Sequence, residues 1–211
     1  MATICYVDGL NLYYGLNKGE WRDYLWLDIP VLASKILERL AWKDDLVSVK
    51  YFTTPMLGDP AKAKRQATYL SALATNPIVS VRLGKMIETE ECCPVCQGTY
   101  TLRHEKETDT GIAAELVRDA AVEKPNGALL IAGDSDYAPP FRILKESFPG
   151  ICTLLAKPPN RGPCDRLRNY CDRYMRIKRD ILEASQFPNE VETEGGIVLR
   201  RPTEFRQGAT T

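Results

Sequence analysis

Four aspartates in three separate stretches of the sequence could form one metal-dependent hydrolytic site. Asp8 ends the stretch TICYVD, Asp109 lies in KETDTG, and Asp134 and Asp136 lie in GDSD. Clustered carboxylates repel one another, so they are stable together only with cations between them. Carboxylate oxygens with open positions suit Mg²⁺ or Mn²⁺, which can activate water and stabilise the leaving oxygen in phosphodiester hydrolysis. The single histidine, His104, argues against a histidine-dependent mechanism.

Each of these aspartates also has a structural interpretation. An Asp after a strand is often a turn residue or a helix N-cap. For Asp109 both interpretations stay open. Two acids within residues 133–136 are more than one cap requires. The coincidence of all three stretches favours a shared site.

The elements that must position these acids alternate between strands and helices. Apolar, β-branched runs predict strands at residues 4–7, 46–52, 78–83, 128–132 and 151–156. Apolar residues spaced by three and four predict helices at residues 29–40, 61–74, 112–122 and 140–147. This alternation predicts an α/β fold with a mostly parallel sheet covered on both faces. Because ligands bind at the carboxyl ends of parallel strands, we expect the acids to meet there.

Composition indicates a single intracellular domain. The 211 residues contain 28 Lys and Arg against 28 Asp and Glu, so a polyanion would have to be held by a local basic patch. The N-terminus lacks the pattern of a signal peptide, and no apolar run approaches the roughly 20 residues that span a bilayer. Seven cysteines, mostly scattered, suit a reducing compartment. We therefore expect a soluble, cytoplasmic protein that does not enter a membrane.

Two segments depart from the alternating pattern. Residues 87–105 contain CCPVCQGTYTLRH and predict a hairpin inserted into a domain that spans residues 1–182. Residues 183–211 form a polar tail, expected to be mostly irregular with one short strand at 197–199.

The hairpin carries half of a zinc site. Cys93 and Cys96 have the C-x₂-C spacing, but tetrahedral Zn²⁺ takes four ligands. Cys92 and His104 are nearby candidates, and a second chain, in a homodimer, could also complete the site. A hairpin with free thiols and no metal is the alternative.

Three residues could bind a nucleic-acid substrate beside the acids. Lys157 and Arg161 follow the strand at 151–156, where they could hold a backbone phosphate. Tyr13 could stack on a base, although core packing is the commoner role of such a tyrosine. The basic residues between Arg166 and Arg179 are interpreted as a solvated helix face.

Four stretches resemble the motifs of the NYN domain family, in the family's order, over about residues 2–180. They are YVDGLNLYYG, EKETDTGIAAELVRDA, LLIAGDSDYAPPFRIL and CDRLRNYCDRYMRI. In the last, Cys164 stands where a small polar residue is expected.

The resemblance implies a PIN-like, three-layer α/β/α domain that cleaves RNA with one or two Mg²⁺ or Mn²⁺ ions. By implication, Asp8, Asp109, Asp134 and Asp136 bind the metal, and Asn11 orients a water or a phosphate. A metal-dependent endoribonuclease is the leading interpretation. The alternative is a non-catalytic RNA-binding or partner-docking module on the same fold, but the loss of acids that would mark it is not found.

Two other enzyme classes fit poorly. A haloacid-dehalogenase-like phosphatase needs a second acid at position 10, which is Leu10. A dinucleotide-binding Rossmann domain needs a glycine-rich first turn, which YVDGLN does not supply.

Overall fold

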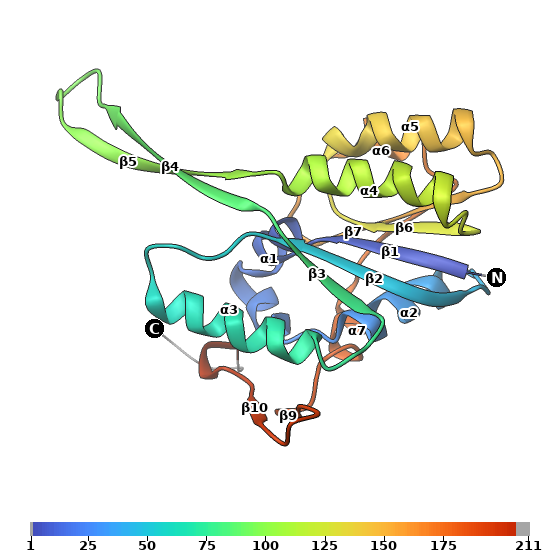
Figure 1. Ribbon diagram of the computed structural model, residues 1–211, viewed down its shortest axis with the longest axis horizontal. Coiled ribbons are helices and arrows are strands. Elements are labelled where there is room, and N and C mark those ends of the chain that lie inside the picture. The colour runs from blue at the N-terminus through green and yellow to red at the C-terminus, as the bar shows by residue number, and fades with distance from the viewer. Residues whose placement is uncertain (1, 206–211) are drawn as a thin grey trace.

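The computed structural model describes residues 2–205 and is built on a six-stranded sheet (Figure 1). The strand order is β3-β2-β1-β6-β7-β8, and every neighbouring pair is parallel. The strands are β1 (Ala2–Asp8), β2 (Asp45–Thr53), β3 (Val79–Leu83), β6 (Gly127–Ile131), β7 (Cys152–Lys157) and β8 (Arg173–Arg176). The predicted parallel α/β architecture is confirmed, with β8 as an additional edge strand.

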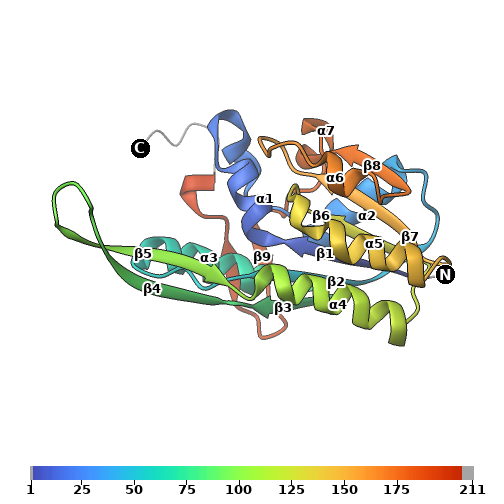
Figure 2. The ribbon, with the colours of Figure 1, turned by 90° about the horizontal axis from the view of Figure 1, so that it is seen from above.

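Helices cover both faces of the sheet and make three layers (Figures 1 and 2). One face carries α1 (Gly9–Leu16), α2 (Ile29–Arg39), α3 (Pro60–Leu73) and α7 (Arg179–Glu183). The other carries α4 (Thr108–Val122), α5 (Ala138–Ser147) and α6 (Asp165–Arg168). Strand β1 shows the division, because Cys5 and Val7 join the first core cluster while Ile4 and Tyr6 join the second. Burial on both sides explains why the central strands are nearly continuous apolar runs.

Aspartate caps set the starts of two predicted helices. The Asp28 side chain accepts the backbone N–H of Val31 at 3.1 Å and begins α2. Asp59 accepts the N–H of Lys62 at 3.0 Å and begins α3, whose first residue is Pro60. Pro is favoured in the first turn because its missing N–H would be unpaired there anyway.

The predicted hairpin is a long two-stranded arm. β4 (Lys85–Cys92) pairs with β5 (Thr99–Lys106) in antiparallel register, and the pair extends away from the body (Figure 1, upper left; Figure 2). We call these residues, 85–106, the arm. It connects β3 to α4, so its base lies at the carboxyl edge of the sheet.

The polar tail is more ordered than its composition predicts. It contains a small hairpin of β9 (Glu190–Glu192) and β10 (Val198–Arg200), followed by a 3₁₀ turn, η3 (Thr203–Phe205). Val191 and Phe205 are buried in the first core cluster. Arg65 also pairs with Glu204 at 2.8 Å. A few apolar residues thus anchor a segment that reads as polar on average. The last residues of the tail, 206–211, lie outside the described range.

The basic stretch does not form one helix face. It spans α6, the edge strand β8 and the start of α7. Arg173 shows the difference, because its guanidinium donates to the carbonyl of Ala41 at 2.8 Å and lies 5.3 Å from the Trp42 ring centroid. The sequence interpretation was wrong here because the strand is too short to show a period.

Within residues 2–205, no helix combines the length and apolarity needed to cross a bilayer. All seven cysteines lie in this range and are free thiols.

Candidate metal-binding cleft

The candidate site lies between β1 and β6, where the order in which strands are added to the sheet reverses. β1 and β6 are neighbours, but β1 continues toward β2 on one side and β6 toward β7 on the other. Such a switch point opens a crevice at the carboxyl ends of the strands. Asp8 is the last residue of β1, and Asp134 follows the end of β6. Both side chains line an open cleft at this edge.

Asp8 is fixed by the helix that follows it. Its Oδ1 accepts the backbone N–H of Asn11 at 2.8 Å, so it is the N-cap of α1, and it is 5% exposed. Burial raises its pKa to about 6, although the hydrogen bonds from Asn11 and Tyr137 oppose that shift. The neighbouring charges of Asp109 and Glu105 raise it further.

Asn11 joins the loops after β1 and β6. Its Oδ1 accepts the N–H of Gly133 at 2.9 Å, and its amide nitrogen makes no hydrogen bond within residues 2–205. Asn11 also lines the cleft. A Cβ on Gly133 would lie 2.7 Å from the Cβ of Arg161, so only glycine fits at position 133. The loops after β6 and β7 can therefore approach closely at this point.

Asp109 comes from the first turn of α4. The N-cap is Glu107, in the left-handed region with φ of 77° and without a capping side-chain bond, so Asp109 is not the cap. Its Oδ1 lies 2.5 Å from the hydroxyl of Tyr137. Burial raises the pKa of Asp109, and the charges of Glu105, Asp134 and Asp136 act in the same direction.

Tyr137 joins two of the acids and was not identified from the sequence. Its hydroxyl lies 2.8 Å from Oδ2 of Asp8 and 2.5 Å from Oδ1 of Asp109. A phenol has one proton and can donate to only one of them at a time. The residue directly follows the GDSD motif, but nothing in the sequence indicates where its buried side chain points.

Asp134 and Asp136 have different places. Asp134 lines the cleft, and its Oδ1 also accepts the N–H of Asp136 at 3.0 Å, so it serves as a turn residue too. Asp136 is exposed beside the cleft, and its side chain is not among those that line it within the described residues. Its charge nevertheless acts on Asp109.

A fifth acid, Glu105, comes from the arm. It lines the cleft beside Asp8 and Asp109 and accepts the N–H of Thr108 at 3.2 Å. It opens the stretch EKETDTGIAAELVRDA but was not identified as a site residue, because its position depends on where the arm returns to the body.

The basic and aromatic residues are placed differently from the prediction in two cases. Arg161 lines the cleft, and its buried Nε has no hydrogen-bond partner among residues 2–205. Lys157 is 8% exposed and does not line the cleft in the described structure, because it ends β7 on the same face as Leu155, toward α5 and α6. Tyr14, which is 50% exposed, lines the cleft, whereas Tyr13 packs against the first core cluster.

The donor set fits a hard divalent cation. The acids offer only oxygen ligands, which such a cation prefers, and Asp8 and Asp109 both contact the Tyr137 hydroxyl. No three acidic, cysteine or histidine side chains between residues 2 and 205 converge into a preformed metal cage. Mg²⁺ typically binds one or two carboxylates and keeps several waters, so it does not require such a cage. Asp8 and Asp109, which share the Tyr137 hydroxyl, are the two candidate ligands.

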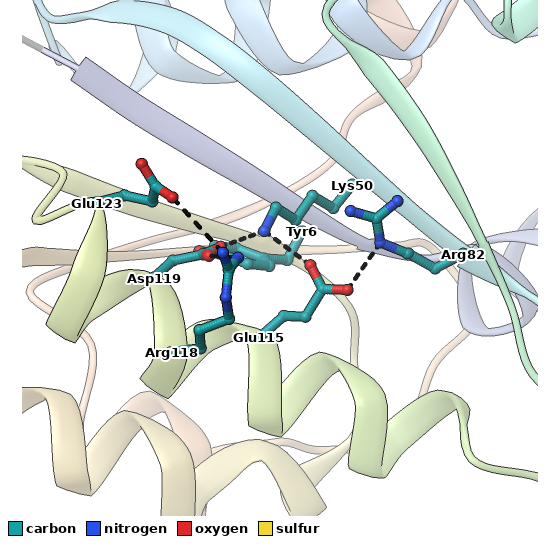
Figure 3. Close-up of polar contacts among 7 residues, drawn as sticks. All are labelled: Tyr6, Lys50, Arg82, Glu115, Arg118, Asp119 and Glu123. Atoms are coloured by element: carbon teal, nitrogen blue, oxygen red, sulfur yellow. Dashed lines mark hydrogen bonds and ion pairs between the residues drawn. The ribbon is translucent and has the colours of Figure 1, made fainter.

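The position of α4 is set by a second polar cluster, away from the cleft (Figure 3). Asp119, which is fully buried, lies 2.5 Å from Lys50 Nζ and accepts the hydroxyl of Tyr6 at 2.7 Å. Lys50 also pairs with Glu115 at 2.7 Å, and Glu115 pairs with Arg82 at 2.7 Å. We call these residues and Arg118 the α4 network. It ties α4 to β1 and β2, the strand pair that ends at the cleft.

The comparisons with known proteins agree with this architecture. The model of the NYN domain family matches residues 2–182. The fold is similar to the crystal structure of VPA0982 from Vibrio parahaemolyticus RIMD 2210633, a protein of unknown function. That similarity has a TM-score of 0.53 and 15% identity, and covers 85% of this chain and 94% of the other. At this identity the likeness concerns the fold alone.

A curated relative is 6-hydroxy-3-succinoylpyridine 3-monooxygenase HspA of Pseudomonas putida (strain DSM 28022 / S16). It is 25% identical over 177 residues, which cover 69% of this chain and 56% of the relative. The match thus spans little more than half the length of that protein. Because the family model covers most of the chain and the fold is nuclease-like, this chain belongs to the NYN domain family.

Proposed function

We propose that the protein is a metal-dependent ribonuclease that hydrolyses phosphodiester bonds in RNA. The supporting observation is one cleft in which Asp8 and Asp109 share the Tyr137 hydroxyl beside the Arg161 guanidinium. Within residues 2–205, no ion pair joins Asp8 or Asp109 to a cation, or Arg161 to an acid. Such acids suit a metal, and such a guanidinium suits a phosphate.

The acids would divide the work of holding the metal. Asp8 and Asp109 would bind it, and Asp134, Asp136 and Glu105 would add negative charge around it. Bound Mg²⁺ or Mn²⁺ would supply an activated water and stabilise the leaving oxygen. Tyr137 would keep the two ligands in place through its hydrogen bonds.

Other residues would hold the substrate. The Arg161 guanidinium can bind a non-bridging phosphate oxygen, and the start of its side chain lies close to Gly133. The free amide nitrogen of Asn11 can donate to the same phosphate. Tyr14 is exposed at the rim and can stack on an unpaired base.

The test is cleavage of a labelled, mixed-sequence RNA and its DNA counterpart with Mn²⁺, with Mg²⁺ and with EDTA. We expect RNA cleavage that requires a metal and disappears in Asp8→Asn/Asp134→Asn. Asp45→Asn is the matched control, because Asp45 is exposed at the start of β2, at the opposite edge of the sheet. RNA that is retained but uncut under every condition would instead support a binding module.

A second candidate function follows from an apolar pocket next to the cleft. Tyrosine side chains and Phe205 line it, and Leu10, Met56 and Lys62 line both cavities. The named relative is a monooxygenase of 6-hydroxy-3-succinoylpyridine, a small aromatic carboxylate. A pocket with aromatic walls and a cation at its edge could bind such a molecule. Isothermal titration calorimetry with this compound tests whether the pocket binds it, and absence of binding would rule out this second function.

A further inference from the structure

The tip of the arm carries three of the seven cysteines and lies far from the cleft. Residues 93–98 join β4 to β5 at the end of the arm (Figures 1 and 2). Cys92 and Cys96 are exposed, and Cys93 is half-buried. The proposed nuclease chemistry uses none of them.

The turn brings Cys93 and Cys96 together. The N–H of Gln97 donates to the carbonyl of Cys93 at 2.9 Å, and the N–H of Cys93 donates to the carbonyl of Gly98 at 2.8 Å. Gln97 takes a left-handed conformation with φ of 58°, which closes the turn. The two thiols are then close enough to hydrogen-bond to each other.

The backbone around Cys93 presents donors to its sulfur. The N–H groups of Cys96 and Val95 point at the sulfur. Such donors suit a cysteine sulfur that binds a metal ion. A pair of adjacent sulfurs with N–H donors is half of a tetrahedral zinc site.

The same chain does not supply the other half. Cys92 Sγ points instead at the carbonyl of Gln97, 3.4 Å away. His104 pairs with Ile87, five residues beyond Thr99 along the strand, or about 17 Å from the tip. No third acid, cysteine or histidine joins the two sulfurs in the part of the chain that the structure describes. Cys92 and His104 of the same chain therefore do not complete the zinc site in this structure.

We propose that two copies of this chain bind one Zn²⁺ between their arm tips, through Cys93 and Cys96 of each copy. A twofold contact presents the same surface from both sides, so two identical pairs of sulfurs give the four ligands that zinc takes. Val95 lies between the two cysteines and is 90% exposed, and this contact would cover it. Because the arm extends from the body, two tips can meet while the bodies stay apart (Figure 1).

The experiment uses the full chain, purified under reducing conditions and supplied with Zn²⁺ alone. Native mass spectrometry and light scattering should give a dimer with one zinc per two chains. A chelator should convert it to a metal-free monomer, and added Zn²⁺ should restore the dimer. Replacement by Co²⁺ should give the absorption of tetrahedral thiolate coordination.

The variants assign the ligands. Cys93→Ser and Cys96→Ser should each yield monomer without stoichiometric zinc, whereas the matched control Cys92→Ser should keep both dimer and metal. Four results overturn the proposal: no zinc, a monomer with one zinc per chain, a dimer that resists chelation, or loss of zinc in Cys92→Ser. The chelation result on the unmodified chain decides the matter even if a serine variant folds poorly.

Discussion

The cleft and the α4 network are built from similar parts but have opposite charge balance. In each, a tyrosine hydroxyl hydrogen-bonds to an aspartate where β1 meets α4. Tyr6 donates to Asp119 in the network, and Tyr137 lies within hydrogen-bonding distance of Asp8 in the cleft. In the network, Lys50 and Arg118 also contact Asp119, at 2.5 and 3.0 Å. In the cleft, Asp8 and Asp109 share one phenol proton, and no ion pair joins either acid to a cation within residues 2–205.

The difference shows which cluster serves the fold and which awaits a ligand. A buried carboxylate with a cation partner and hydrogen bonds is stable as it stands. A buried carboxylate beside other acids is destabilised unless a cation binds, and burial already raises the pKa of Asp8 to about 6. Four substitutions would break or sharpen this contrast.

The largest expected effect is on stability, from Lys50→Met. It would leave Asp119, which is 0% exposed, with only Arg118 as a cation partner. We expect the free energy of unfolding to fall by about 3 kcal/mol, as when one partner of a buried ion pair is removed. Urea denaturation measures it. The control is Arg39→Met, which breaks the exposed Arg39–Asp180 pair and should cost under about 1 kcal/mol. Similar losses in both would contradict the role of the network.

Asp8→Asn should have the largest effect on activity. It removes a charged ligand while Asn keeps the N-cap of α1, so RNA cleavage should fall at least about 100-fold. Single-turnover cleavage with Mn²⁺ measures it. A variant as active as the unmodified protein would remove Asp8 from the site.

The same variant should stabilise the metal-free protein. The pKa of Asp8 is about 6 when folded and about 3.9 when unfolded. Between these values the folded state binds more protons, so stability falls as pH rises from about 4 to about 6 and stays reduced above. At neutral pH, Asp8→Asn should raise the free energy of unfolding by roughly 1–3 kcal/mol and flatten this pH dependence.

Urea denaturation in EDTA across that pH range measures the effect. Added Mn²⁺ should stabilise the unmodified protein and leave Asp8→Asn nearly unchanged. Equal stabilisation of both proteins by Mn²⁺ would place the metal elsewhere.

The smallest effects come from the two tyrosines. Tyr137→Phe removes the donor shared by Asp8 and Asp109, and we expect cleavage to fall about 10-fold, as when a metal ligand loses its supporting hydrogen bond. Tyr6→Phe should cost about 1 kcal/mol of stability without changing cleavage, because Asp119 keeps its cations. If the two variants behaved alike in both assays, the proposed difference between the clusters would fail.

Sequence reasoning predicted the fold better than the side-chain geometry of the site. The first five strands of the main sheet and its four longest helices follow from apolar runs and apolar periodicity, which act over a few residues. β8 and β9 are too short for periodicity to show, whereas β10 lies within one residue of the short strand predicted at 197–199. Lys157 and Tyr13 were expected beside the acids, but the pleat of β7 and the turn of α1 direct them toward core layers.

The sequence by itself determined the alternation of elements, and thereby the edge of the sheet at which Asp8 and Asp134 arrive. That information is local, because the burial pattern lies within each segment and a helix between two strands makes them parallel. Only the tertiary structure decided that Tyr137 bridges Asp8 and Asp109, that Glu105 reaches the cleft from the arm, and that His104 lies far from Cys93. These relations depend on packing between segments distant in the chain, where a shift of a few ångströms makes or breaks a hydrogen bond.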